Sequence, residues 1–373
     1  MKTLLLSICI VFLITSCNKK KPDNATISAF TDSIPEVTEE PSFPSLIPGE
    51  VELADEVFGD VVELTGTSHP LDQLFKVQET QLLAKENMLI IKNRNADNYF
   101  MAFTLPDFHL INSFGRRGKG PGEFTGPSII QTLQPEYLFS VYSTNGKIYH
   151  INRSFELIDS KISLDTKRQL YDPNKICAAS ADEFYYVGVA PVAKEIYKYS
   201  AKDSIPETSI NKLSVKGFKG WASYTGYLGA NFNKDRLVFA YKYFKKIVFT
   251  DLSGNVERTI NFDTNTKTDK QSNVSILGPS SVTYYWGMSA HEDYVYLLYS
   301  GRTPLVVTEE LREGSGYIYV EQFDWNGKPI RKYRLDHWGY FCVDDIEENI
   351  YLASTTDENP IYSFKLPENQ ETK

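Results

Sequence analysis

A pattern of alternating apolar and polar positions recurs six times after residue 100. Each copy is a strand rich in aromatic or β-branched residues, then a small turn, then a second strand, which is the pattern of a β-hairpin. The copies occupy 102–114, 149–162, 197–210, 248–260, 321–334 and 361–370. The residues just before the six turns are Leu105, Asn152, Ser200, Asp251, Asp324 and Lys365. They are 47, 48, 51, 73 and 41 residues apart, so the pattern is a repeat.

The length of this repeat indicates the architecture. A period of about 40–50 residues that holds four strands is typical of a β-propeller blade. Further strand-like runs at 183–190, 235–243 and 294–300 fall between the hairpins, and the chain has no long amphipathic helix pattern. Because stacked blades bury their faces against one another, so long a chain can form one repeat domain. We therefore predict an all-β fold, a six-bladed β-propeller of four-stranded antiparallel blades over residues 49–370.

The pattern also predicts the limits of each blade. Blade 1 takes its strands from 74–80, 87–93, 99–105 and 108–114. Blades 2 to 5 cover 128–164, 175–213, 227–262 and 281–335. Insertions at 263–280 and 301–316 account for the one long interval. Blade 6 has only three strands left, and we predict that 61–66 supplies its outer strand, which would leave no open sheet edge in the ring.

The first residues predict export. A basic start at Lys2 precedes an apolar stretch at 4–14, which is too short to span a bilayer of about 30 Å and indicates a signal peptide over 1–16. The tetrapeptide Ile-Thr-Ser-Cys that ends at Cys17 resembles the lipobox of bacterial lipoproteins. That resemblance implies a diacylated, palmitate-bearing Cys17 at the mature N-terminus. The alternative is an ordinary secretory peptide in which Cys17 is incidental.

Residues 17–48 are predicted to be the lipidated cysteine and a flexible tether. Five prolines are scattered among Ser, Thr, Asp and Glu, a composition that cannot bury enough apolar surface to fold. The run Lys19, Lys20 and Lys21 would lie against anionic headgroups. Asn18 is not the aspartate that marks inner-membrane retention in enteric bacteria. We therefore expect a lipid-anchored protein of the cell envelope, at the outer membrane and facing the periplasm.

The net charge and the cysteine content exclude some classes of partner and of chemistry. The formal net charge is −9 at pH 7, which argues against a nucleic-acid partner. Cys177 and Cys342 fall on the inner strands of blades 3 and 6, too far apart in a six-bladed ring for a disulfide. We predict that both are small buried apolar residues rather than redox or catalytic groups.

A glycine-rich segment at 114–124 is the most specific motif. Its glycines, the Gly-Glu-Phe that ends it and a following proline resemble the NHL-repeat signature. The same arrangement occurs in the TolB-like six-bladed propeller lipoproteins of Bacteroidetes, and together with the lipobox, tether and blades it makes the whole chain similar to that family. The spacing is not that of a nucleotide-binding loop. We interpret the segment as a structural connection, with anion contact by Arg116, Arg117 and Lys119 as the alternative.

Loops predict where a ligand would bind. Connections from an outer strand to the next inner strand share one face with the loops between second and third strands, and we call it the connection face. His69, Arg94 and Arg168 fall on it. The residues of this face that we predict to bind ligand are Arg116, Arg117, Lys119, Trp221, Tyr224, Arg302, His337 and Trp338. Aromatic residues with arginine on scaffolded loops are typical of recognition surfaces.

Catalytic patterns are sparse. The five histidines form no HExxH motif and no pair at metal-ligand spacing, so we predict no metal and no cofactor. Two hypotheses remain. The first is a non-enzymatic envelope lipoprotein whose propeller face binds a protein, peptide or glycan. The second is a propeller hydrolase or lyase with carboxylates, histidine or a bound Ca²⁺ in its channel. The sequence favours the first, although fold alone does not decide function.

Overall fold

The computed structural model describes residues 49–72, 80–92, 97–133, 135–164, 176–189, 194–203, 207–215, 221–262, 281–344 and 346–367. The predicted signal peptide, Cys17 and the tether lie outside these residues, as do Arg94, Arg168 and 263–280. No helix in the described part of the chain is long and apolar enough to cross a membrane.

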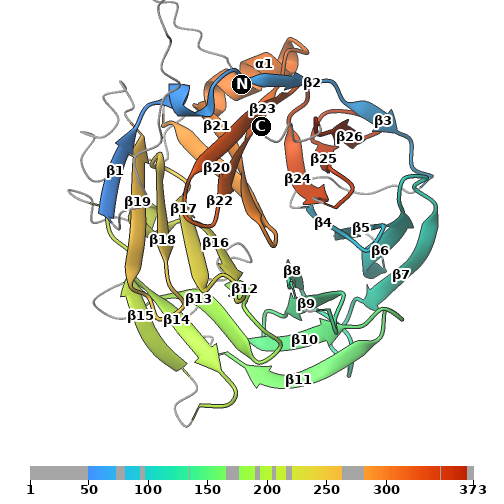
Figure 1. Ribbon diagram of the computed structural model, residues 1–373. Coiled ribbons are helices and arrows are strands. Elements are labelled where there is room, and N and C mark those ends of the chain that lie inside the picture. The colour runs from blue at the N-terminus through green and yellow to red at the C-terminus, as the bar shows by residue number, and fades with distance from the viewer. Residues whose placement is uncertain are drawn as a thin grey trace, which may run out of the picture. The chain divides into compact units, whose positions relative to one another are not determined.

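Six sheets are arranged in a ring, each built on four strands that run antiparallel to their neighbours (Figure 1). The predicted six-bladed propeller is therefore confirmed. Blade 1 consists of β4 (Gln81–Lys85), β5 (Met88–Lys92), β6 (Asn98–Thr104) and β7 (Leu110–Arg116). Blade 2 consists of β8 (Ser128–Ile130), β9 (Phe139–Tyr142), β10 (Lys147–Ile151) and β11 (Leu157–Ser163). Blade 3 consists of β12 (Ile176–Ala178), β13 (Glu183–Val189), β14 (Lys194–Ser200) and β15 (Glu207–Lys212).

The second half of the ring follows the same plan. Blade 4 begins after the 3₁₀ turn η3 (Trp221–Tyr224) and consists of β16 (Gly226–Asn231), β17 (Arg236–Tyr241), β18 (Lys246–Thr250) and β19 (Val256–Phe262). Blade 5 consists of β20 (Thr283–Ala290), β21 (Tyr294–Arg302), β22 (Ile318–Asp324) and β23 (Pro329–Leu335). Blade 6 contributes β24 (Gly339–Asp344), β25 (Asn349–Ser354) and β26 (Ile361–Lys365). In blades 1 to 5 the first of the four antiparallel strands is the innermost, and in blade 6 the innermost strand is β24 (Figure 1).

The insertion in blade 5 forms the helix α1 (Pro304–Arg312), between β21 and β22. Thr303 caps its N-terminus, because its side-chain oxygen accepts a hydrogen bond from Val306 N at 3.3 Å. The proline at the first helical position needs no such partner. Because α1 joins the second and third strands of its blade, it lies on the connection face.

The predicted limits of blades 2 to 5 agree with the structure, but the predicted first strand of blade 1 is wrong. The structure uses β4, at 81–85, where the sequence favoured 74–80; residues 73–79 lie outside the described part. The middle of β4 is the buried apolar run Leu82-Leu83-Ala84. An inner strand is covered on both faces by neighbouring blades, so continuous apolar character identifies it better than alternation does.

The predicted closing strand is also wrong, by a few residues. β3 (Thr67–His69) pairs antiparallel with β26 and completes blade 6, as the fourth strand of that sheet. The apolar segment proposed for this role instead forms β2 (Val62–Leu64), which runs parallel to β23 of blade 5. Upstream, β1 (Gly49–Leu53) runs parallel to β19 of blade 4. The N-terminal strands, blue in Figure 1, therefore fasten three successive blades.

The core is divided among the gaps between blades. Six buried apolar clusters occur among the described residues, and each draws side chains from two neighbouring blades. Between blades 1 and 2, for example, Phe100 packs against Phe139 with ring centroids 5.4 Å apart and against Phe124 at 6.2 Å. The outer strand β19 alternates between half-buried and buried positions after its exposed first residue, because its two faces are unequally covered.

One gap also contains charged groups, which we call the buried charge cluster: Asp55, Lys245, Glu321 and Lys332. It lies between blades 4 and 5, under the 3₁₀ turn η1 (Asp55–Phe58). The side chain of Glu321 is fully buried, and its Oε1 lies 3.0 Å from Lys332 Nζ and 3.6 Å from Lys245 Nζ. Asp55 pairs with both lysines, at 3.6 Å from Lys332 Nζ. Two cations thus meet two carboxylates.

Aromatic rings enclose this cluster. Lys245 Nζ lies 4.4 Å and Lys332 Nζ 4.3 Å from the ring centroid of Tyr299. Tyr285 donates its hydroxyl proton to Glu321 Oε2 at 3.2 Å. Burial alone would raise the pKa of Asp55, but the two ammonium groups outweigh it and hold that pKa below its usual value.

Candidate ligand-binding site

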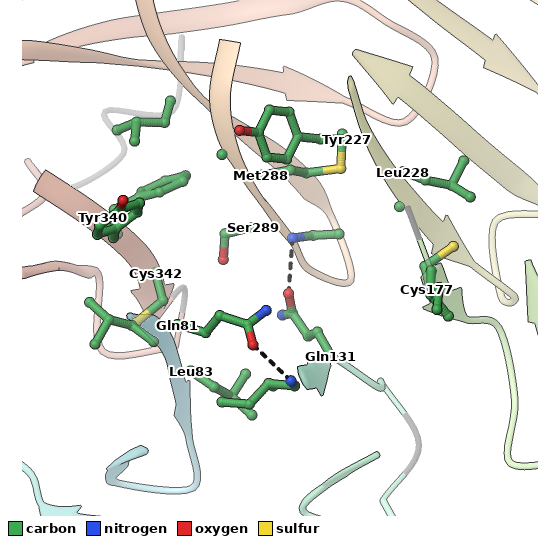
Figure 2. A pocket seen from close by; sticks show the side chains of 18 of the residues that line it. Gln81, Leu83, Gln131, Cys177, Tyr227, Leu228, Met288, Ser289, Tyr340 and Cys342 are labelled. Carbon is green, nitrogen blue, oxygen red and sulfur yellow. Dashed lines mark hydrogen bonds between the residues drawn. The ribbon is translucent and has the colours of Figure 1, made fainter. Parts of the chain in front are cut away.

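The six innermost strands enclose a cavity of about 140 Å³, which we call the central cavity. Every blade contributes to its wall (Figure 2). The wall comprises Thr80, Gln81, Leu82, Leu83, Ile129, Gln131, Leu133, Ile176, Cys177, Ala178, Tyr227, Leu228, Gly229, Ala230, Trp286, Gly287, Met288, Ser289, Ala290, Leu298, Tyr340, Phe341 and Cys342.

These wall residues carry no charge. Among them the structure places no carboxylate, histidine, lysine or arginine. Both cysteines lie on inner strands and are buried and free, as predicted. Burial raises the pKa of the Cys177 and Cys342 thiols, so both remain protonated and weakly nucleophilic at neutral pH.

Two glutamine amides supply the most directional polar groups of the wall. Gln81 is the first residue of β4, and its Oε1 accepts a hydrogen bond from Ile129 N at 3.0 Å. Gln131 directly follows β8, and its Oε1 accepts one from Ala290 N of blade 5 at 3.3 Å. A backbone N–H can only donate, so each amide must direct its oxygen to it and its NH₂ group elsewhere. Figure 2 shows both amides pointing into the cavity.

The two ends of the cavity differ. Tyr227 and Tyr340 are the second residues of β16 and β24, so they lie at the end where the connections from outer strands arrive. Ala290 is the last residue of β20, and Gln131 follows the last residue of β8. Because all inner strands run in the same direction, the tyrosines lie toward the connection face and the contact between Gln131 and Ala290 lies toward the opposite face.

A row of aromatic and cationic side chains links the cavity wall to the connection face. Trp286 belongs to the wall, and its indole N–H is buried without a hydrogen-bond partner. Lys242 Nζ lies 4.4 Å from its ring centroid, and Trp338 meets it edge-on at 5.5 Å. The Arg302 guanidinium in turn lies 5.6 Å from the Trp338 ring and 3.7 Å from the Tyr317 ring. We call Lys242, Trp286, Trp338, Arg302 and Tyr317 the aromatic row.

The structure thus brings two of the eight predicted ligand residues together. Arg302 also has a structural task, because its guanidinium donates to the Glu310 carboxylate of α1 and to the Tyr317 carbonyl. His337 lies beside Trp338 in the chain, and its Nδ1 is 2.6 Å from Asp336 Oδ1. The same carboxylate accepts a hydrogen bond from Gly66 N at 3.1 Å, next to the closing strand.

The glycine-rich loop is a structural connection, as interpreted from its sequence. Phe124 is buried between blades 1 and 2 and pairs through its backbone with Arg117. The Glu123 carboxylate accepts from Gly120 N at 2.9 Å and lies 3.3 Å from Arg116 Nε. Arg116, Arg117 and Lys119 are exposed. Their contact with an anion stays a prediction, on a different connection from the aromatic row.

The remaining predicted residues lie between blades 3 and 4. Tyr224, at the end of η3, is half-buried and packs against the cluster between these blades, and burial raises its pKa. The side chain of Trp221 lies outside the described residues. The eight residues therefore share a face but not one site.

Sequence reasoning missed Gln81, Gln131, Trp286, Tyr227 and Tyr340. A usable signal existed in the two glutamines, which are single polar residues next to the apolar runs Leu82–Ala84 and Ile129–Ile130. The carboxylates and histidines of the hydrolase hypothesis are not among the described residues that line the cavity. Nor do any three His, Cys, Asp or Glu side chains, within the part that the structure describes, gather closely enough to hold a metal ion.

Comparison with known proteins shows the family to which this sequence belongs. Residues 58–346 match the family described as TolB-like 6-blade propeller-like. The chain belongs to this family. A member of the DUF4221 family from Bacteroides vulgatus has a similar structure, with a TM-score of 0.55 and 12% sequence identity over 82% of this chain and 98% of that one.

A candidate exported protein from Bacteroides fragilis is also similar to this TolB-like propeller. The TM-score is 0.50, with 14% identity over 84% of this chain and 98% of that one. At such identities the likeness concerns the fold. No curated protein matches the sequence.

Proposed function

We propose that this TolB-like propeller is an exported, lipid-anchored protein of the cell envelope that binds a protein, peptide or glycan partner without catalysis. The observation that carries the binding role is the aromatic row, which runs from the cavity wall to the connection face. Tryptophan, tyrosine and arginine dominate the energetics of recognition surfaces. On this face the helix α1 also exposes Leu305 and Val306, with 51% and 40% of their surface accessible.

The anchor is proposed from the N-terminal sequence. The predicted signal peptide covers residues 1–16, Cys17 follows it as the last residue of a lipobox-like tetrapeptide, and the predicted tether is rich in proline. The structural likeness to a candidate exported protein agrees with export. The proposed location is the outer membrane, with the propeller facing the periplasm.

The anchor is tested by replacing one residue in the full chain. Cys17→Ser should abolish metabolic labelling with palmitate and move the protein from the membrane fraction to the soluble fraction. Cys177→Ser, which changes a buried thiol inside the propeller, is the control and should keep both properties. Labelling that survives Cys17→Ser would overturn the proposed anchor.

The binding face is tested by photo-crosslinking in cells with two matched valine positions. A photo-reactive residue replaces Val306, on α1 of the connection face, or Val256, the 49% exposed first residue of β19 at the opposite face. We expect one saturable adduct from position 306, suppressed by excess unlabelled protein, and none from position 256. Equal adducts from both positions, or none from either, would contradict the proposed face.

A further inference from the structure

The hydrogen-bond inventory of the central cavity is unbalanced toward donors. The amide oxygens of Gln81 and Gln131 are both occupied by backbone N–H groups. Their NH₂ groups have no acceptor among the described residues, and the Trp286 indole N–H has none either. By contrast Ser289, on the same wall, accepts from Val343 N at 3.2 Å and pairs with His291 Nε2 at 2.8 Å.

Donors of this kind define the complementary ligand. Buried donors without acceptors are costly, and protein side chains satisfy most of them. The NH₂ groups of Gln81 and Gln131, which face the cavity, would be satisfied by a molecule that supplies several oxygen acceptors. Hydroxyl, ether and carbonyl oxygens all meet this requirement.

The absence of charge on the cavity wall restricts the ligand further. A carboxylate or an ammonium group would lose its hydration on entering, and the described wall residues include no opposite charge to compensate. The two cationic groups of the aromatic row lie over ring faces, and the Arg302 guanidinium is already bound to Glu310. An uncharged ligand avoids this cost.

The volume and the aromatic wall of the cavity limit the size and shape of the ligand. The volume of about 140 Å³ is close to that of an engineered cavity of about 150 Å³ that holds one benzene ring. Tyr227, Trp286 and Tyr340 provide ring surfaces against which C–H groups can pack. A six-membered ring with C–H groups and several hydroxyls fits this combination of donors, rings and volume.

We propose that the central cavity binds a single uncharged sugar ring, either free or as the end of a glycan. This assignment rests on the proposed binding role of the connection face and names the ligand class for it. The hydroxyl and ring oxygens of the sugar accept from the NH₂ groups of Gln81 and Gln131, and the C–H groups pack against the tyrosines at the end of the cavity nearest that face.

The test measures sugar binding to the full chain purified in detergent, by calorimetry and by the change in tryptophan fluorescence. The neutral ligands are D-glucose, D-galactose and D-mannose, and the charged counterparts are D-glucuronate and D-glucosamine. We expect saturable binding of at least one neutral sugar and binding of its charged counterpart that is weaker by tenfold or more. No saturable binding of any neutral sugar, or equal binding of the charged sugars, would overturn the proposal.

Two substitutions localise the binding. Gln81→Glu and Gln131→Glu keep an oxygen for the backbone N–H groups but remove the donors, so the affinity should fall about tenfold. Val256→Ala, at the exposed first residue of β19 and outside the cavity wall, should bind as the original chain does. Unfolding curves confirm that each variant folds, and the other glutamate variant carries the test if one of them does not. Unchanged affinity in the donor variants would place the sugar elsewhere and overturn the assignment.

The result of the sugar-binding test can be distinguished from the result of the crosslinking experiment. An adduct at position 306 without sugar binding would retain the binding face and remove the sugar from the cavity. Sugar binding without an adduct would retain the cavity site and remove the macromolecular partner.

Discussion

The central cavity and the buried charge cluster both contain polar groups inside the propeller. They differ in whether those groups have partners within the chain. In the charge cluster two lysines meet two carboxylates, so each formal charge has a partner. Among the described residues of the cavity wall there is no charge, and the NH₂ groups of Gln81 and Gln131 and the indole N–H of Trp286 have no acceptor. The first region is complete within the chain, whereas the second would be completed by a ligand.

The charge cluster and the cavity also lie at different places in the ring, as their different polar groups would lead us to expect. The charge cluster lies between blades 4 and 5, and Asp55 joins it from the N-terminal segment that fastens three blades. It therefore couples closure of the ring to packing of two blades. The cavity lies where all six blades meet, and no residue there is needed to hold two particular blades together by charge. A self-satisfied polar region serves stability, and an unsatisfied one is a better candidate for binding.

The largest effect is expected from Glu321→Gln. The substitution leaves Lys245 and Lys332 buried with Asp55 as their remaining partner, and it should lower the free energy of unfolding by about 3–5 kcal/mol. Urea denaturation measures it. The control is Glu63→Gln, which breaks the exposed pair of Glu63 with Arg334 and should change stability by less than about 1 kcal/mol. Equal losses in the two variants would show that the cluster does not depend on charge balance.

A smaller effect with a distinct pH dependence is expected from Asp55→Asn. Because 52% of the Asp55 side chain is exposed, the loss at neutral pH should be about 1–2 kcal/mol. The folded pKa of Asp55 is lowered, so its contribution is complete above the unfolded pKa of about 4 and is lost as pH falls through the folded value. The difference between original and variant in unfolding free energy should therefore shrink in acid. A constant difference would rule out the carboxylate as the cause.

A matched pair of tryptophans sharpens the comparison. Trp325 donates its indole N–H to the His291 carbonyl at 2.9 Å, whereas the indole N–H of Trp286 has no acceptor. Trp→Phe removes a similar volume at both sites, so the difference between them isolates the hydrogen bond. Trp325→Phe should cost about 1–2 kcal/mol more than Trp286→Phe in thermal or urea unfolding. Equal costs would indicate that the Trp286 N–H is as well satisfied as that of Trp325.

The smallest effect concerns the thiols. In a chain carrying Cys9→Ser and Cys17→Ser, Cys177 and Cys342 should react with iodoacetamide far more slowly in the native state than in urea. Burial raises the pKa of both, so increasing the pH through the mildly alkaline range should accelerate the native reaction little. Mass spectrometry measures the modified fraction. Rapid native labelling of either thiol would show that the cavity wall is more accessible than its burial indicates.

The success and the failures of prediction have a common origin. Repeated hairpins identified the blades because a short turn joins the third and fourth strands, and that signal is local in the sequence. The inner strand β4 and the closing strand β3 were misplaced because they lack that pattern: β4 is apolar throughout its centre, and β3 is the short polar run Thr67–His69. For the site, the sequence placed Arg302 and Trp338 on the connection face, but it did not reveal the cavity.

The sequence alone therefore determined the number of blades, their order, the burial of both cysteines and the face on which arginine and tryptophan gather. These properties follow from local periodicity, which a chain carries wherever it lies in space. Only the tertiary structure decided which strand closes the ring, which carboxylates meet Lys245 and Lys332, and which donors remain without acceptors. Those depend on residues that are distant in sequence, such as Gln131 and Ala290, and a hydrogen bond left unmade can be recognised only after every neighbour is in place.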